Sequence, residues 1–146
     1  MKEILKTMDE LLEKECYIID IFPEKVPENS NGQFFDVEDY LLNSEKYNAI
    51  KDKFVNIVLK LMCYYHMAIV KDGLIDKPSP EQVENAVNEI VVNQKAVLNC
   101  LFQEENMLLV FDRDCLNLSI YNPSKETHNL FEKLARSEGL FWRLSE

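Results

Sequence analysis

Hydrophobic residues recur every three or four positions in four stretches of the chain, which is the period of an amphipathic helix. Residues 3–15, 45–62, 80–92 and 125–138 have this pattern. The third stretch begins with Ser79-Pro80-Glu81-Gln82, a capping box in which Ser79 and Gln82 can satisfy each other's backbone N–H groups. Gly139 follows the last stretch and is a candidate C-terminal cap.

Runs rich in β-branched and aromatic residues predict the strands. They cover residues 16–22 and 63–70, and residues 96–121 are typical of a three-strand meander. In the last meander strand, LNLSIY, alternate leucine and isoleucine residues predict one face toward the core and one toward water. Asp20 interrupts the first run and predicts a solvated face there. The apolar tail LFWRL is expected to dock as a last short strand.

The clearest loop is residues 23–33, PEKVPENSNGQ, where proline, asparagine, serine and glycine cluster. The next residues allow two interpretations. Phe34 to Val37 could form a short strand, or a helix capped by Asp36 could begin here. We favour a short extended piece that runs into a helical turn.

The predicted order is helix, strand, helix, strand, helix, three strands, helix. We therefore expect a single α+β domain over residues 1–146. Its single sheet would be mixed or mainly antiparallel, with about five to six strands and with the helices packed mostly on one face.

Charge narrows the possible partners. The formal net charge is -10, and residues 1–46 hold five lysines against twelve Asp or Glu residues. A surface of this sign repels nucleic acid and anionic membranes, so we expect neither as a partner. It suits a basic protein or cations, unless the acidity only keeps the protein soluble. Neither a signal peptide nor a membrane span is evident, and four scattered cysteines favour a reducing cytoplasm.

The chain has no recognisable catalytic constellation. Cys115 could pair with His128 or His66 as nucleophile and base, but Asp114 beside it disfavours a thiolate. Asp112-Arg113-Asp114 is more typical of a turn than of a metal site. We expect no catalytic residue, no cofactor and no metal site.

Two groups of residues remain as candidate binding sites. The first is an acidic, aromatic segment that could dock a protein partner: Glu28, Phe34, Phe35, Asp36, Glu38, Asp39 and Tyr40. The second would face outward from the sheet and could bind a small ligand: Tyr64, His66 and Tyr121. For the first group the alternatives are a solvated acidic surface or a loop packed onto the rest of the domain. For the second group the alternative is the ordinary solvent-exposed face of a sheet.

The segments CYIIDIFPEKVPENSNGQFFDVEDYLL and SEGLFWRL resemble parts of small, uncharacterised cytosolic bacterial proteins. This resemblance implies no activity and no site residues. In size, acidity and layout the chain is also similar to toxin-neutralising immunity proteins and to acidic secretion chaperones, which are α+β dimers.

These observations favour a non-enzymatic protein-binding module, with an immunity-type role as its sharpest form. A second hypothesis is a small enzyme or ligand-binding domain with a pocket near His66. A third is assembly into a homodimer, for which LNLSIY could be the exposed strand edge.

Overall fold

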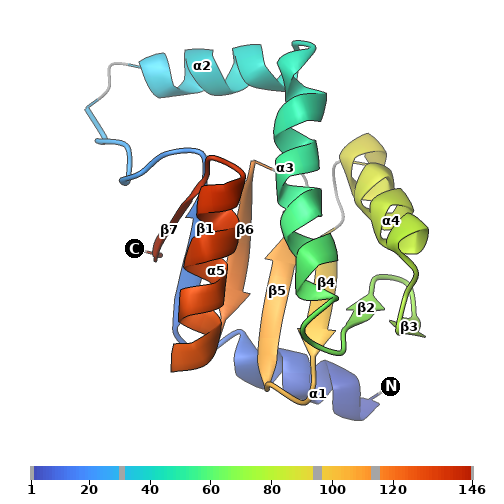
Figure 1. Ribbon diagram of the computed structural model, residues 1–146. Helices are drawn as coiled ribbons and strands as arrows, with labels where there is room; N and C mark the ends of the chain where they lie inside the picture. The colour runs from blue at the N-terminus through green and yellow to red at the C-terminus, as the bar shows by residue number, and fades with distance from the viewer. Residues whose placement is uncertain (1, 30–31, 94–96, 113–115, 146) are drawn as a thin grey trace.

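The fold was obtained as a computed structural model that describes residues 2–29, 32–93, 97–112 and 116–145. These residues form five helices and seven strands (Figure 1). In chain order they are α1 Lys2–Leu11, β1 Cys16–Asp20, α2 Gln33–Leu42, α3 Lys46–Leu61, β2 Ala68–Val70, β3 Leu74–Asp76, α4 Pro80–Asn93, β4 Leu98–Phe102, β5 Met107–Phe111, β6 Asn117–Tyr121, α5 Lys125–Ser137 and β7 Phe141–Leu144.

The strands form one sheet in the order β3-β2-β4-β5-β6-β1-β7, and every neighbouring pair is antiparallel. The predicted α+β class with a single sheet is confirmed, but the number of strands is seven rather than five to six. The unpredicted strand is β3. It follows directly after the strand predicted over residues 63–70, because Lys71 to Gly73 turn the chain back: the Lys71 N–H donates to the Gly73 carbonyl at 3.2 Å.

Helices α3, α4 and α5 cover one face of the sheet and α1 lies on the other (Figure 1). The larger core lies between the three helices and the sheet, where Phe54, Phe102, Phe111 and Phe131 are fully buried. Burial of a large apolar side chain stabilises the fold by roughly 1.5–3 kcal/mol. This face of the sheet therefore supplies most of the hydrophobic stabilisation.

Helix α1 closes a smaller core on the opposite face. Met8 and Leu11 pack with Val70, Leu101 and Leu108. This face is therefore only partly solvated.

Two predicted elements differ in the structure. Residues 34–37 are helical rather than extended: they belong to α2, and the Asp36 N–H donates to the Gly32 carbonyl at 3.2 Å. The strand predicted over 63–70 begins only at Ala68, since the backbone N–H groups of Tyr64 and Tyr65 still bond to Leu61 at the end of α3.

The strand expected to be an exposed edge lies inside the sheet. β6 pairs with β5 on one side and with β1 on the other. LNLSIY therefore cannot pair two copies, and the sheet edges are β3 and β7.

The predicted caps at Ser79 and Gly139 are confirmed, whereas Asp36 does not cap α2, whose N-cap is Gly32. The Gln82 N–H donates to the Ser79 hydroxyl at 3.1 Å, and the Ser79 N–H donates to the Gln82 side chain at 2.9 Å. Gly139 has a φ of 73°, the left-handed backbone that glycine adopts without strain after a helix. Among the described residues, no helix combines the length and apolar character needed to cross a bilayer.

A polar link at the end of α5 joins it to α3. Asn56 and Lys60 donate to the two carboxylate oxygens of Glu138 at 3.0 and 2.9 Å. Burial alone raises the pKa of Glu138, but these hydrogen bonds outweigh it, so the pKa lies below its usual value. A carboxylate whose pKa is lowered in the native state stabilises the fold at neutral pH.

We predict that Glu138→Gln lowers the free energy of unfolding at neutral pH and weakens its dependence on pH. Glu138 contributes fully to the free energy of unfolding above the pKa that it has in the unfolded chain. This contribution disappears as the pH falls through the lower pKa that it has in the native state. Urea unfolding across the acidic range measures this. Glu132→Gln, at an exposed carboxylate within α5, is the matched control. Parallel stability curves for wild type and Glu138→Gln would contradict the prediction.

Candidate functional site

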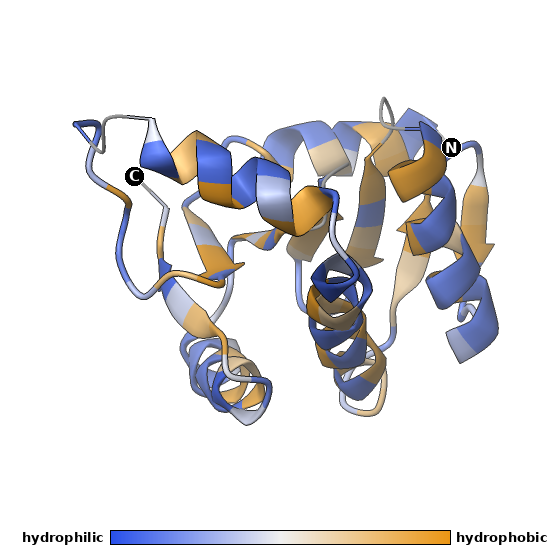
Figure 2. Cartoon of the chain, turned by 90° about the horizontal axis from the view of Figure 1, so that it is seen from above, coloured by the Kyte–Doolittle hydropathy of each residue, from blue (hydrophilic) through white to orange (hydrophobic). Residues whose placement is uncertain are grey.

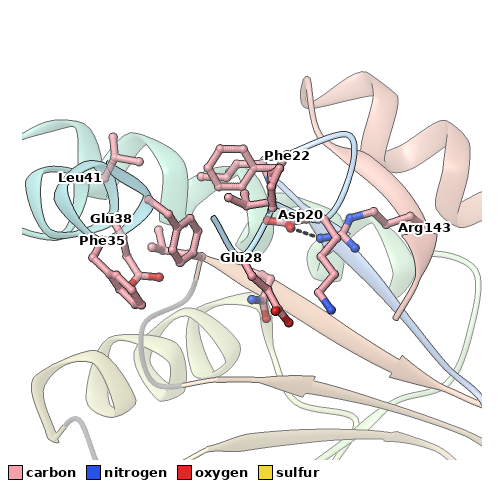
Figure 3. Close-up of a pocket in the computed structure, with 14 residues that line it drawn as sticks. Asp20, Phe22, Glu28, Phe35, Glu38, Leu41 and Arg143 are labelled. Atoms are coloured by element: carbon pink, nitrogen blue, oxygen red, sulfur yellow. Dashed lines mark hydrogen bonds and ion pairs between the residues drawn. The ribbon is translucent and has the colours of Figure 1, made fainter. Parts of the chain in front are cut away.

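A cavity of about 320 Å³ lies where the chain leaves β1 and crosses to α2. Its walls come from the loop after β1, from α2 and from the ends of β6 and β7 (Figure 3). Most lining residues are apolar or aromatic: Ile21, Phe22, Val26, Pro27, Phe34, Phe35, Leu41 and Leu116. The polar ones are Asp20, Lys25, Glu28, Glu38, Asn117 and Arg143.

An ion pair between neighbouring strands forms one wall of this cavity. Arg143 on β7 donates to Asp20 on β1 at 2.7 Å, and the side chains are 19% and 12% exposed. The Ile21 N–H donates to the other Asp20 oxygen at 2.7 Å. Arg143 Nε is buried and has no acceptor among the described residues. Two charges therefore lie in a largely apolar setting, where each is stabilised by the opposite charge of the other.

Helix α2 forms the opposite wall and directs its two adjacent phenylalanines differently. Successive helical residues point about 100° apart. Phe34 is half-buried and its ring centroid lies 5.9 Å from that of Phe22, whereas Phe35 is 69% exposed. Both line the cavity, Phe34 from inside and Phe35 at its rim.

The outer side of α2 carries two aromatic and two acidic side chains at adjacent helical positions. Phe35, Asp36, Asp39 and Tyr40 are all exposed, and Tyr40 is 61% accessible. No α2 residue is buried, although several are hydrophobic. Figure 2 looks down onto this helix, which lies across the end of the molecule with hydrophobic residues visible along it. We call these four residues the α2 stripe.

The charge around the cavity is predominantly negative. Residues 22–45 contain six Asp or Glu residues and one lysine. In the cavity lining, the carboxylates Asp20, Glu28 and Glu38 outnumber the cations Lys25 and Arg143, and Arg143 is paired with Asp20. The site therefore presents an apolar cavity inside an acidic rim.

The predicted partner-binding residues lie in the cavity lining or on α2 beside it. Glu28, Phe34, Phe35 and Glu38 line the cavity. Asp36, Asp39 and Tyr40 belong to α2 but lie outside the cavity lining.

Sequence reasoning missed the strand residues of the cavity, above all Asp20 and Arg143. We interpreted Asp20 as a marker of the solvated face, but it is 8% exposed and paired. The available signal was one charged residue within each of two apolar runs, CYIIDIF and LFWRL. Their pairing could not be inferred without the strand order.

The predicted ligand-binding residues are not brought together. Tyr64 and His66 border a separate hollow of about 370 Å³ near β2. Tyr121 lies on the strand row that continues through Leu108 and Leu101 to Ala68. Three strand spacings amount to roughly 14 Å, so Tyr121 is far from the start of β2. It packs instead beside α1.

The His66 ring contacts carboxylates and not the other two predicted ligand-binding residues. Its Nε2 lies 2.6 Å from Asp76 Oδ1, and its Nδ1 lies 3.7 Å from a Glu104 oxygen. Within the described ranges, no three His, Cys, Asp or Glu side chains converge as a metal site would require.

The cysteines that the structure describes have different environments. Burial raises the pKa of Cys100 to about 12, so its thiol is not ionised at neutral pH. Cys63 is exposed. His128, the proposed base, packs edge-on against Tyr17 and Trp142 at ring separations of 4.3 and 5.3 Å. Cys115 and the predicted turn at residues 113–114 lie outside the described residues.

No protein-family model, curated protein or solved structure matches this chain. Its function is therefore inferred from the geometry described above.

We predict that Arg143→Met lowers the free energy of unfolding by about 2–3 kcal/mol, because it leaves the Asp20 carboxylate largely buried without its cation. Asp20→Asn in the same chain should recover much of this loss. Urea unfolding of the wild type, both single variants and the double variant gives the coupling energy. Strictly additive effects would show that the two charges do not depend on each other.

Proposed function

We propose that this chain is a non-enzymatic protein-binding module that docks a basic partner on the α2 stripe and its adjoining cavity. The observation that carries the proposal is an aromatic, acidic helix face that no element of the described residues covers. Phe35 and Tyr40 are mostly exposed on a helix that has no buried residue. Aromatic residues of this kind are enriched at protein interfaces.

The energetics favour partner docking on this surface. Burial of an aromatic side chain removes a large apolar area from water and contributes about 1.5–3 kcal/mol. Phe35 and Tyr40 together could therefore supply much of the affinity of a modest interface. Asp36 and Asp39 lie between them and would attract lysine or arginine side chains during the approach.

The cavity offers an anchor point beside the stripe. Its volume and apolar lining suit one large aliphatic or aromatic side chain of the partner. A basic residue next to that anchor would meet Glu28 at the cavity rim. The expected partner segment therefore combines an apolar anchor with flanking positive charge.

An immunity-type role is the sharpest form of this proposal, with a basic toxin as the partner. The general proposal requires only a basic partner. In this proposal, burial of the aromatic side chains supplies most of the binding energy, and charge attraction raises the rate of association.

We predict that replacement of Glu28, Asp36 and Asp39 together by lysine abolishes salt-sensitive partner capture while the chain stays folded. These carboxylates are exposed, so reversal of their charge removes attraction rather than packing. Partners retained from the source lysate by the purified chain, at low and at high salt, are compared by mass spectrometry. Exposed charge pairs are screened by ions, so high salt should also release the partner.

The matched control reverses three exposed carboxylates elsewhere: Asp52, Asp72 and Glu84. It has the same net charge as the triple variant but an intact α2 stripe. Retention by the control and loss by the triple variant support the proposal. Equal retention by both would overturn it, since the α2 carboxylates would then not matter, and equal loss by both would overturn it as well, since only net charge would then matter.

The aromatic contribution is tested separately. Phe35→Ala or Tyr40→Ala should each weaken binding of the captured partner roughly tenfold or more, as expected for an interface anchor. Val92→Ala, at an exposed apolar position on α4, is the control and should have no effect. Titration calorimetry with the purified partner measures these differences.

A small-molecule ligand is the second candidate, because the cavity volume of about 320 Å³ lies within the range of ligand sites. A ligand that binds only the native state raises the melting temperature. A metabolite screen by thermal shift tests this candidate. A shift that persists in the lysine triple variant but disappears in Phe34→Ala would favour a ligand over a protein partner.

A further inference from the structure

We infer that the partner binds as an added β-strand along the free edge of β7, so that its backbone extends the sheet and one of its side chains enters the cavity. This inference deepens the proposed function and rests on it. It names the mode of recognition: an extended segment of a basic protein, paired through backbone hydrogen bonds. Three features of the structure lead to it.

The first feature is the set of backbone groups on β7 that have no neighbouring strand among the described residues. In an antiparallel pair, residues alternate between those that bond to the neighbour and those that point away. The Ser145 N–H donates to the Cys16 carbonyl at 3.0 Å, and Arg143 is opposite Ile18 in the same register. By this alternation Arg143 bonds inward to β1, whereas the N–H and C=O groups of Trp142 and Leu144 point outward.

The second feature is that, within the described residues, β7 carries less of the usual edge protection than β3 does. Natural sheet edges are shielded by short strands, charges or proline. The other edge, β3, has three residues, ends at Asp76 and is followed by Lys77 and Pro78. β7 has four residues without proline, and its one charge is neutralised by Asp20.

The third feature is that the free edge and the cavity meet. Arg143 belongs to β7 and also lines the cavity. Because side chains alternate along a strand, Phe141 lies on the same face as Arg143, and Trp142 and Leu144 lie on the other. An added strand would therefore direct alternate side chains toward the cavity and toward the α5 side.

Charge selects the occupant of this edge. The loop after β1 carries Glu24, Lys25 and Glu28, and of these Lys25 and Glu28 line the cavity together with Arg143 of β7. A second copy of this chain would bring the same acidic loop and a further net charge of -10. A basic segment from another protein would instead find opposite charge at the edge. We therefore assign the edge to a basic partner rather than to self-pairing.

The decisive variant is Leu144→Pro, with Leu144→Ala as its matched control. Both remove the leucine side chain, but only proline removes the outward N–H. Leu144 does not bond to β1 through that group, and proline is tolerated in edge strands. The purified full chain is used to select binders from a random peptide library, and affinities of the selected peptides are measured for wild type and both variants.

We expect Leu144→Pro to bind at least about tenfold more weakly than Leu144→Ala, because a backbone acceptor of the peptide then lacks its donor. Equal affinities of the two variants would overturn strand addition. Thermal melting and the emission of Trp142 verify that both variants are folded. Trp142 is the single tryptophan and stacks between Tyr17 and Phe131 at 5.0 and 4.9 Å, so its emission reports on this part of the fold.

A second measurement does not depend on the variants. Backbone N-methylation is placed at each position of a selected peptide in turn. Strand addition predicts that the loss of affinity alternates along the peptide, because only every second N–H faces β7. A loss without this alternation would overturn the inference, even if Leu144→Pro failed to fold.

The outcomes separate this inference from the proposed function. Peptides that depend on Asp36 and Asp39 but not on the Leu144 N–H would support the basic partner and exclude strand addition. Dependence on the Leu144 N–H alone would support strand addition and exclude the α2 stripe. Selection of no peptide that depends on either would overturn both. A wild-type dimer that Leu144→Pro converts to monomer would identify a second copy as the occupant.

Discussion

The position of β1 between β6 and β7 is the constraint on which the remaining structure depends. Cys16–Asp20 is bonded on both sides, so its register fixes where the chain leaves the sheet. That exit point places the following loop and α2 over the sheet end (Figure 1). It also brings Asp20 beside Arg143, two residues that lie far apart in the sequence. The cavity exists because this exit, α2 and β7 meet at one corner.

Elements with a strong repeating pattern were predictable from the sequence. The four long helices and the meander of β4, β5 and β6 follow from periodicity alone, since each has a buried face that requires its own spacing. Helix α2 could not be predicted in this way, because its hydrophobic residues face in several directions and none is buried. β3 was missed since three residues are too few to show alternation.

The candidate site likewise contains residues that could be predicted from the sequence and residues that could not. Local composition identified the acidic and aromatic residues of α2, because they are neighbours in the sequence. Asp20 and Arg143 escaped identification because their contact arises from strand order, which no local pattern encodes. Tyr121 was grouped wrongly with His66 for the same reason: both were assigned to the outward face, without knowledge that three strand spacings separate their strands. Long-range pairing therefore sets the limit of inference from this sequence.

The pairing of β1 with two strands from late in the sequence also has a consequence for biosynthesis. β1 is made early, yet its partners are Asn117–Tyr121 and Phe141–Leu144. During translation the first strand must remain unpaired until most of the chain has left the ribosome. The β4-β5-β6 meander has only local connections and can form first, as a template onto which β1 and then β7 dock. In the interval, both the apolar β1 segment and the open side of β6 are exposed, and this is the stage at which the nascent chain is most prone to aggregate or to require a chaperone.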